Sequence, residues 1–399
     1  MKSFFFLASA VICFHLAYVS GRPAMGLLIF GYAFALVRLA DQPSVRRAFY
    51  FGLAAGFIDA AVEAFFFWEI FHPAAVILWL VYAFWIGLFT ALSCGCLRRW
   101  GPGKALWLLP ILWTGIEYFR SELYYLRFSW LNIGYALPPF CDGLGMYFAG
   151  FAVLALCVSV LYARMIHRLA AILVPAGLLL VFGALLAWSA VASRHPAPSS
   201  VSLTGVQVEF PPENVIPKLL DQALGKNPGA DIFVLSEYAL EGPVPASLQD
   251  WCRAHSRYLV VGGKDVVTNS VYYNTAFVIG TNGDIVFKQA KSVPIQFFQD
   301  GLPATNQAVW ESPWGKIGIC ICYDLSYTRV TDELVRKGAQ LLIVPTMDVS
   351  SWGKREHELH ARVAPVRAAE YGLPIFRLTS SGISQVIDSF GRVTDRTDF

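Results

Sequence analysis

Long apolar stretches separated by short polar segments fill the first half of the chain. Each stretch is close to the length of about 20 mostly apolar residues that a membrane-spanning helix requires. We identify seven, at residues 3–20, 24–40, 48–70, 74–94, 105–120, 143–163 and 169–192. The pattern predicts a transmembrane domain of about seven helices over residues 1–193.

Beyond a short linker at 194–200, which contains Pro and Ser, the pattern changes to short apolar runs and amphipathic segments. Apolar or alternating runs of this length are typical of strands. We predict strands at 202–209, 231–235, 258–263, 271–279, 284–287, 316–321, 340–345 and 374–378, and helices at 331–337 and 355–371. This alternation favours a layered α/β domain over residues 201–399.

The composition separates the same two halves. The chain is 56% hydrophobic and 15% charged, whereas soluble domains carry roughly 25% charged residues. Residues 1–193 hold 19 of the charged side chains and residues 194–399 hold 40. The apolar content excludes disorder. The net charge of +3 comes without a basic run, so nucleic acid is not an expected partner.

Basic residues predict the orientation of the membrane half. Most fall before the first stretch and in alternate loops, at Lys2, Arg46, Arg47, Arg98, Arg99, Lys104, Arg164 and Arg168. The opposite loops are poorer, apart from the third, where Glu122 and Asp142 balance Arg120 and Arg127. Because Lys and Arg concentrate in cytoplasmic loops, we expect a cytoplasmic N-terminus. Seven crossings then put residues 194–399 on the outer side of the membrane.

A few polar groups interrupt the apolar stretches. Asp59 and Glu63 are one helical turn apart, so they either face the interior of the bundle or serve a function. Glu117 and Arg120 have a spacing that allows them to pair. The aromatic segment 128–135 suits a membrane interface, as an anchoring belt or as the floor of a lipid-facing site.

The cysteines and histidines give no metal motif. The eight cysteines lack paired zinc-ligand spacing and do not indicate a disulfide framework. No Cys-rich or acid-rich segment accompanies His357-x-x-His360 to supply further ligands, so we expect no metal there.

Three residues with acyl-transfer chemistry stand where predicted strands end. Glu237 follows one strand, Lys291 another, and Cys322 ends the run KIGICI. A carboxylate can take the proton of a thiol, and the thiolate can then attack an acyl group. A lysine ammonium can stabilise the oxyanion that forms. Singly, such a Glu is more often a solvated loop residue and such a Cys a small core residue.

The surrounding motifs resemble the nitrilase, or carbon–nitrogen hydrolase, superfamily. The matching segments run in order through nearly all of 201–399: Leu235-Ser236-Glu237, Gly283 through Lys291, Gly318-Ile319-Cys320-Ile321-Cys322-Tyr323-Asp324, Thr346-Met347-Asp348 with Trp352-Gly353, His360 followed by Arg367-Ala368-Ala369-Glu370, and Ser381-Gly382-Ile383-Ser384. The resemblance implies a nitrilase-like αββα sandwich that needs no cofactor.

A membrane half ahead of such a domain is similar to the apolipoprotein N-acyltransferase family. Trp113, Glu117 and Arg120, with Phe128-Ser129-Trp130 and Gly134-Tyr135, resemble that family's membrane pattern. The resemblance implies a multi-pass enzyme of the bacterial inner membrane with its catalytic domain in the periplasm. Its donor would be a phospholipid, and its acceptor the α-amine of a diacylated apolipoprotein.

The same resemblance implies roles for individual residues. Glu237 would be the base, Lys291 the oxyanion stabiliser and Cys322 the nucleophile. The family's lysine stands eight residues after the glycine that precedes the strand, and counting from Gly283 gives Lys291 rather than Lys288. Side chains alternate along a strand, so these two lysines would lie on opposite faces. Residues expected to bind substrate or support the site are Tyr323, Asp324, Trp352, His360, Arg367 and Glu370. We expect the last three to brace the site or pair with one another.

The sequence also departs from the family pattern. Segment 292–300 is shorter than usual and lacks an expected Glu, for which Asp300 is a candidate replacement. The acid after the nucleophile is Asp324 rather than Glu, and no final span follows Gly391, as in a fragment or a shortened relative. Two rival hypotheses are a membrane-tethered amidase and an inactive lipid-binding module; the complete Glu, Lys and Cys set argues against the second.

Overall fold

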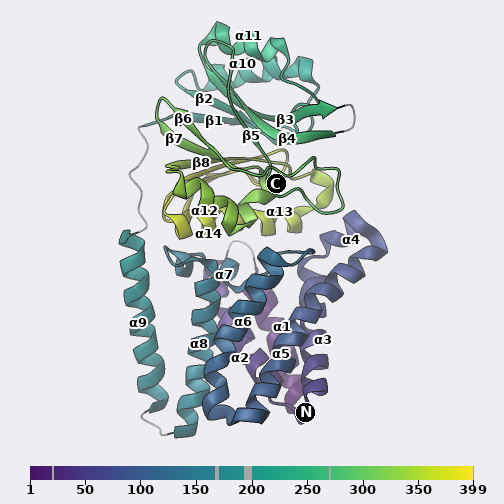
Figure 1. Cartoon of the computed structure of the whole chain (residues 1–399), viewed down its shortest axis with the longest axis vertical. Coiled ribbons are helices and arrows are strands. Elements are labelled where there is room, and N and C mark those ends of the chain that lie inside the picture. Colours follow the sequence, from purple (N-terminus) through teal and green to yellow (C-terminus); the bar gives the residue numbers. More distant parts are fainter. Residues whose placement is uncertain (20–21, 167–169, 193–199, 269–270, 399) are drawn as a thin grey trace. The chain divides into compact units, whose positions relative to one another are not determined.

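The computed structural model describes residues 1–19, 22–166, 170–192, 200–268 and 271–398 (Figure 1). The chain divides into two compact units, Met1–Ser193 and Arg194–Phe399. Most of the predicted linker 194–200 lies outside the described residues.

The first unit is helical, and a helix occupies each of the seven predicted stretches. Its α-helices are α1 Lys2–Ala17, α2 Ile29–Ala40, α3 Val45–Glu63, α4 Phe66–Phe71, α5 Ala75–Ala105, α6 Leu109–Tyr118, α7 Ile133–Ala136, α8 Gly145–Ile166 and α9 Ala170–Ala192. Short 3-10 segments at Pro23–Leu28, His72–Ala74, Leu106–Leu108 and Pro138–Cys141 and a π-helical turn at Phe119–Leu123 connect them.

By length and composition, three helical segments of the described residues are candidates to cross a membrane, fewer than the seven predicted. They are Phe66–Leu123, Gly145–Met165 and Ile172–Ser189. The first joins two predicted stretches, because the chain bends at Gly101 (φ +71°) without a break in the helical run. The apolar helices Lys2–Ala17 and Ala24–Ala40 are shorter, and α3 carries four charged residues.

The two acidic residues of α3 face the interior of the helical unit. Asp59 and Glu63 are both buried. Glu63 Oε1 lies 2.7 Å from Nδ1 of His15 on α1, and Asp59 Oδ1 lies 3.9 Å from Nε2 of the same ring. The interior alternative offered by the sequence is confirmed for this pair.

Glu117 and Arg120, whose spacing allows them to pair, form their hydrogen bonds with other groups. Both side chains turn to segment 128–133. Glu117 accepts a hydrogen bond from the N–H of Ile133 at 3.0 Å. Arg120 donates to the carbonyl of Phe128 at 2.9 Å and to Oδ1 of Asn132 at 2.7 Å. The segment's own polar groups provide better-aligned partners than a neighbour one helical turn away, and this fixes the segment against α6.

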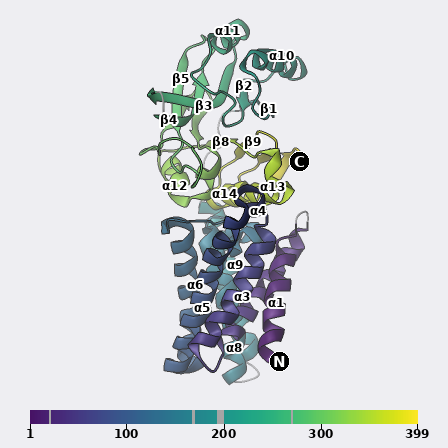
Figure 2. The same ribbon diagram turned by 90° about the vertical axis from the view of Figure 1, so that its right-hand side faces the viewer.

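The second unit contains two sheets with helices on their outer faces (Figures 1 and 2). The first sheet has the order β1-β2-β3-β4-β5, and the second has the order β11-β10-β9-β8-β7-β6. The strands are β1 Leu203–Val206, β2 Ile232–Leu235, β3 Tyr258–Thr268, β4 Val271–Ile279, β5 Ile285–Ala290, β6 Val309–Ser312, β7 Gly315–Ile319, β8 Leu341–Thr346, β9 Ile375–Thr379, β10 Gln385–Ile387 and β11 Val393–Arg396.

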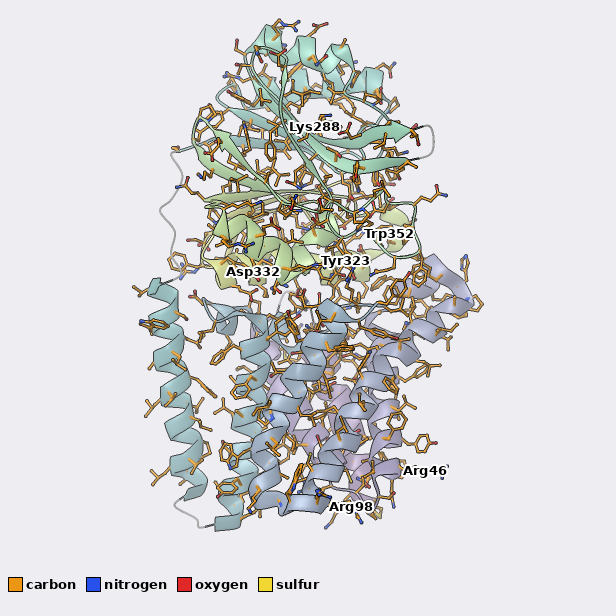
Figure 3. The ribbon with its side chains drawn as sticks, viewed as in Figure 1. Arg46, Arg98, Lys288, Tyr323, Asp332 and Trp352 are labelled. Atoms are coloured by element: carbon orange, nitrogen blue, oxygen red, sulfur yellow. The ribbon has the colours of Figure 1, made fainter. Side chains whose placement is uncertain are left out.

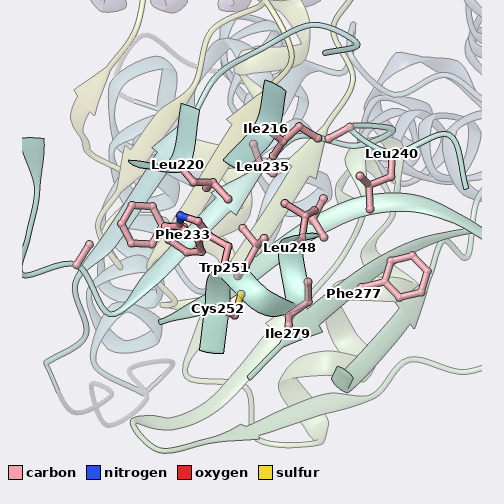
Figure 4. Packing of buried hydrophobic residues seen from close by; sticks show 14 residues of the cluster. Ile216, Leu220, Phe233, Leu235, Leu240, Leu248, Trp251, Cys252, Phe277 and Ile279 are labelled. Carbon is pink, nitrogen blue, oxygen red and sulfur yellow. The ribbon is translucent and has the colours of Figure 1, made fainter. Parts of the chain in front are cut away.

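Helices α10 and α11 cover the first sheet, and α12, α13 and α14 cover the second (Figures 1 and 2). Their bounds are α10 Ile216–Lys226, α11 Ala246–His255, α12 Thr328–Arg336, α13 Lys354–Ala361 and α14 Val363–Tyr371. Figure 4 shows apolar side chains from α10, α11 and the first sheet packed together, including Leu220, Phe233 and Trp251. The arrangement confirms the predicted αββα layers.

Parallel pairing positions the ends of the central strands. β1, β2 and β3 are parallel neighbours in the first sheet, and β7, β8 and β9 are parallel neighbours in the second. Side chains that follow parallel strands gather at the carboxyl edge of a sheet, where α/β proteins place their sites. Glu237 follows β2 and Cys322 follows β7.

The helix predicted at 355–371 is wrong as one element: the chain forms α13 and α14, separated at Arg362. Pro365 has no N–H to donate to the carbonyl four residues earlier, so the hydrogen-bond ladder is interrupted there. The prediction also lacked α10, α11 and the three strands β6, β10 and β11. These strands are short, and β11 is exposed along its length, so it has no apolar alternation to detect.

Candidate active site

Cys322 stands at a strained turn after β7. It begins the 3-10 helix Cys322–Ser326, and its φ is +51°, a left-handed value that residues other than glycine seldom adopt. The side chain is buried, and its Sγ lies 3.8 Å from the carbonyl oxygen of Met347 in the loop after β8. The turn therefore holds a thiol at the edge of the second sheet.

Glu237 is buried at the corresponding edge of the first sheet. Its Oε1 accepts hydrogen bonds from Lys291 Nζ at 2.8 Å and from Asn274 Nδ2 at 2.6 Å. Its Oε2 accepts a hydrogen bond from the N–H of Met347 at 2.8 Å. Met347 therefore contacts both the carboxylate and the thiol, so the two sheets meet at this residue.

The two candidate lysines lie in opposite surroundings. Lys291 is fully buried, and its Nζ lies 2.8 Å from Glu237 Oε1 and 2.7 Å from Asp300 Oδ2. Lys288 is exposed and pairs with Asp265 at 3.0 Å. In Figure 3, Lys288 lies among the strands of the first sheet, well away from the labelled Tyr323. The geometry agrees with the choice of Lys291.

Asp300 occupies the place where the sequence lacks the expected Glu. Besides Lys291, its carboxylate accepts hydrogen bonds from Tyr238 Oη, Asn274 Nδ2 and the N–H of Ile295, each at 2.8 Å. Sequence reasoning missed Asn274. The available signal was an amide in the middle of the otherwise apolar strand 271–279, where only a buried hydrogen-bond partner justifies a polar side chain.

Burial and charge set the protonation of this group. Burial, with the charge of Asp300, raises the pKa of Glu237 above its ordinary value against the pull of Lys291. For Lys291, burial alone would lower the pKa, but the carboxylates of Asp300 and Glu237 raise it. Burial and the nearby Glu237 raise the pKa of the Cys322 thiol. These surroundings favour the neutral thiol at Cys322 and the ammonium at Lys291, and they make Glu237 a stronger proton acceptor than an ordinary glutamate.

Asp324 ties the Cys322 turn to the segment after Lys291. Its carboxylate accepts hydrogen bonds from the N–H groups of Ile321 (3.2 Å), Ser292 (3.0 Å) and Val293 (2.7 Å). Burial raises its pKa to about 6, although Lys291 and these backbone donors favour the charged form. Asp324 therefore positions the backbone on which two of the candidate catalytic side chains stand.

Arg367 supports the same turn from α14. Its guanidinium donates to the carbonyl oxygens of Leu325 at 3.0 Å and Ser326 at 2.8 Å, and it pairs with Glu370. Tyr323, beside the thiol in sequence, is buried with its ring centroid 5.1 Å from that of Tyr327. Arg367 and Glu370 therefore pair with each other beside the turn that carries Cys322.

His360 belongs to a different group, so the expectation that it pairs with Arg367 or Glu370 is wrong. Its Nδ1 lies 2.7 Å from Asp348 Oδ1, and Arg377 donates to the other oxygen of Asp348 at 2.8 Å. The break between α13 and α14 separates His360 from Arg367. Burial lowers the pKa of His360 to about 4 despite the nearby Asp348, so the neutral ring donates from Nδ1.

One trio in the described residues has the ligand types of a metal site: Asp348, Glu356 and His360, whose donor atoms lie within 4.8 Å of one another. Arg377 already supplies a positive charge to Asp348, and burial raises the pKa of Glu356 so that it favours the neutral form. A cation would have to compete with the guanidinium. The trio is better explained as a closed network that fixes the loop following β8.

Trp352 lies beside the loop that follows Lys291. It is half-buried, and its ring centroid is 5.9 Å from that of Phe298. Phe297, the residue before Phe298, is exposed and has a φ of +70°. Trp352 thus contacts the shortened segment 292–300 rather than the buried charged groups.

Comparisons with known proteins cover both units. The carbon–nitrogen hydrolase family matches residues 189–398, and the apolipoprotein N-acyltransferase N-terminal domain matches residues 12–158. An apolipoprotein N-acyltransferase of Shewanella oneidensis is 26% identical over 81% of this chain and 72% of its own length. One of Geobacter metallireducens is 25% identical over 92% of this chain and 82% of its own length.

Two other similarities cover half of this chain or less. A deaminated glutathione amidase of Dictyostelium discoideum is 28% identical over 38% of this chain and 60% of its own length. The solved carbon–nitrogen hydrolase of Helicobacter pylori is 19% identical, covers 50% of this chain and 85% of its own, and has a TM-score of 0.45.

The chain belongs to the carbon–nitrogen hydrolase family, whose match spans more than half of its residues. Within that family its similarity over most of its length is to apolipoprotein N-acyltransferases, and the helical unit matches the N-terminal domain named after them. The resemblance found in the sequence is confirmed.

Proposed function

We propose that this chain is a phospholipid:apolipoprotein N-acyltransferase that works through a thioester on Cys322. The observation that carries the proposal is the buried contact of Glu237 and Cys322 with the same residue, Met347, beside the Lys291 ammonium. A base, a thiol and a fixed cation suffice for acyl transfer. The similarity to apolipoprotein N-acyltransferases over most of the chain supports the choice of substrates.

In the first half-reaction the thiol loses its proton to Glu237 and its sulfur attacks the ester carbonyl of a phospholipid. Negative charge develops on the carbonyl oxygen. Lys291 uses one N–H on Glu237 and one on Asp300, which leaves its third N–H for that oxygen. The carbon–oxygen bond then breaks, the lysophospholipid alkoxide takes the proton from Glu237, and an acyl thioester remains.

In the second half-reaction the α-amine of the diacylglyceryl-cysteine attacks the thioester carbonyl. Glu237 accepts the amine proton as the nitrogen–carbon bond forms, and the carbon–sulfur bond breaks. The proton then returns to the sulfur. The products are an amide-linked lipoprotein and the starting thiol, and no cofactor enters the balance.

The membrane setting is part of the proposal. We infer that the helical unit is a multi-pass bundle in a bacterial inner membrane and that the catalytic unit lies on the periplasmic side. The three long apolar helices and the alternation of basic loops support this arrangement. Both substrates are lipids, so a bundle lets them reach the enzyme within the bilayer.

The test is to trap the intermediate. The full-length enzyme, supplied with phospholipid and no acceptor, should accumulate an acyl group on Cys322, read by mass spectrometry of its peptide. The Glu237→Gln variant should remain unmodified. Acylation at Cys320, or full activity in Cys322→Ala, would overturn the assignment.

The same preparation tests the amidase alternative, in which water replaces the amine. Adding a diacylated lipopeptide should discharge the thioester into an amide-linked product with ping-pong kinetics. Release of free fatty acid at one rate with or without the lipopeptide would favour hydrolysis instead.

A further inference from the structure

A surface groove runs between the N-terminal halves of α1 and α3 in the helical unit. Its volume is about 380 Å³. Phe4 and Leu7 line it from α1, and Phe51 and Ala54 line it from α3. The Phe4 and Phe51 rings meet edge to face with centroids 5.4 Å apart. The floor is therefore apolar and open along one side, as an acyl chain requires.

Two arginines border this groove. Arg46 and Arg47 line it and are exposed. The Arg46 guanidinium lies over the Tyr50 ring at 5.8 Å, and that of Arg47 over the Phe51 ring at 5.7 Å. These contacts hold both cations beside the groove.

Neither arginine forms an ion pair with an acidic side chain of the described residues. The acid nearest in sequence, Asp41, lies 3.6 Å from Arg38 instead. Arg98 adds a third cation to this end, since it donates to the carbonyl of Pro43, one residue before the Ser44 N-cap of α3. Figure 3 shows Arg46 and Arg98 at the same end of the helical unit. The groove therefore joins an apolar floor to uncompensated positive charge.

We propose that this groove binds one anionic phospholipid, with the phosphate at Arg46 and Arg47 and an acyl chain along Phe4, Leu7, Phe51 and Ala54. Charge complementarity selects the occupant: a phosphodiester without its own ammonium satisfies two guanidinium groups, whereas a zwitterionic headgroup competes with them. The site lies wholly within the helical unit. The inference rests on the membrane setting proposed above but not on the acyl transfer.

The test measures lipid binding in a chain that cannot consume lipid. Full-length Cys322→Ala, purified in detergent, is titrated with phosphatidylglycerol and with phosphatidylethanolamine and analysed by native mass spectrometry. We expect one phosphatidylglycerol to bind more tightly than any phosphatidylethanolamine. Adding Arg46→Gln and Arg47→Gln should weaken that binding about 10- to 30-fold and remove the preference.

Three further variants distinguish binding at this site from non-specific electrostatic attraction. Arg47→Gln is compared with Arg164→Gln, which removes an exposed arginine from the end of α8; only the first should weaken binding. Ala54→Phe fills the groove without a change of charge and should also weaken it. Unchanged binding in the Arg46/Arg47 double variant, or an equal loss in Arg164→Gln, would overturn the proposal. Thioester formation, measured separately, tests the proposed function whatever the outcome here.

Discussion

Lys291 has the environment expected of a group that stabilises developing negative charge. It is held between Glu237 and Asp300 without access to water, so its charge acts at full strength and needs no reorganisation during the reaction. Lys288, three residues earlier, has neither property because its ion pair with Asp265 is exposed. A substitution at each position should separate the two.

Lys291→Met should lower the rate of acyl transfer by about 10²–10³-fold. It also leaves two buried carboxylates without a cation, which costs about 3–5 kcal/mol of folding stability. The rate is therefore normalised to folded protein, measured by thermal unfolding of the purified enzyme. Lys288→Met is the matched control and should change stability by less than about 1 kcal/mol. Full activity in Lys291→Met with loss in Lys288→Met would reverse the assignment.

Asp300 should set the pH dependence of the reaction. Glu237 must be ionised to accept a proton, so the rate falls as the pH drops through its pKa. The charge of Asp300 raises that pKa. Asp300→Asn should therefore move the acidic limb of the kcat/KM profile to lower pH. Asp265→Asn, which alters the exposed pair with Lys288, should leave the limb in place; an upward shift in Asp300→Asn would contradict the prediction.

Residue types and spacing were enough to select Glu237, Lys291 and Cys322 as candidates, since each follows a recognisable strand. They were not enough for the groups that hold these side chains. Asn274 contacts Glu237 across 37 residues, and Asp300 contacts Tyr238 across 62. Such contacts depend on how the strands pair and on the path of the loops, and neither can be predicted from a local sequence pattern.

At the scale of elements, the site depends on close packing between β3 and the segment after β2. A Cβ placed on Gly262 of β3 would lie 2.6 Å from the Cα of Glu237 and 2.7 Å from the carbonyl oxygen of Ser236. Both atoms belong to backbone and cannot rotate away. Gly262 is therefore required by the position of the carboxylate rather than by its own conformation.

Gly262→Ala should displace Glu237 and reduce acyl transfer by about 10²-fold, as a shift near 1 Å does in other active sites. It should cost about 1–3 kcal/mol of stability through overpacking. Gly229→Ala is the control, because a Cβ there meets nothing within 4 Å. Steady-state rates and thermal unfolding are measured for both; equal effects of the two substitutions would contradict this account.

The central strands of the second unit were predictable because apolar runs that end at polar residues are easily recognised in the sequence. The division of 355–371 into two helices was harder to predict, because the helical periodicity is continuous there and a single proline interrupts the hydrogen bonding. In the first unit, the apolar stretches located the long helices but not their lengths, and they did not indicate α4 as a separate helix or α7 at all. Only three segments of the described residues are long and apolar enough to be candidate spans, against seven expected. The charges in α3 and the helical run that continues through Gly101 account for part of this difference.

For the whole molecule, the arrangement of basic residues predicts a topology that can be measured. A reporter active only outside the cytoplasm, fused after residue 199, should give signal, because the basic loops predict a cytoplasmic N-terminus and seven crossings before that residue. After residue 44, in a basic loop, only a reporter that is active in the cytoplasm should give signal. The reverse pair of results would contradict the orientation of both units.

The burial of Cys322 has one more consequence, for the chemical durability of the enzyme. Oxidants and alkylating agents react with thiolates that they can reach. Cys322 is about 2% exposed, and burial and the nearby Glu237 raise the pKa of its thiol. In the proposed mechanism its thiolate forms only when Glu237 takes the proton during attack on a bound substrate. The same burial that keeps the sulfur as a thiol until then should therefore also protect it from peroxide and disulfide exchange.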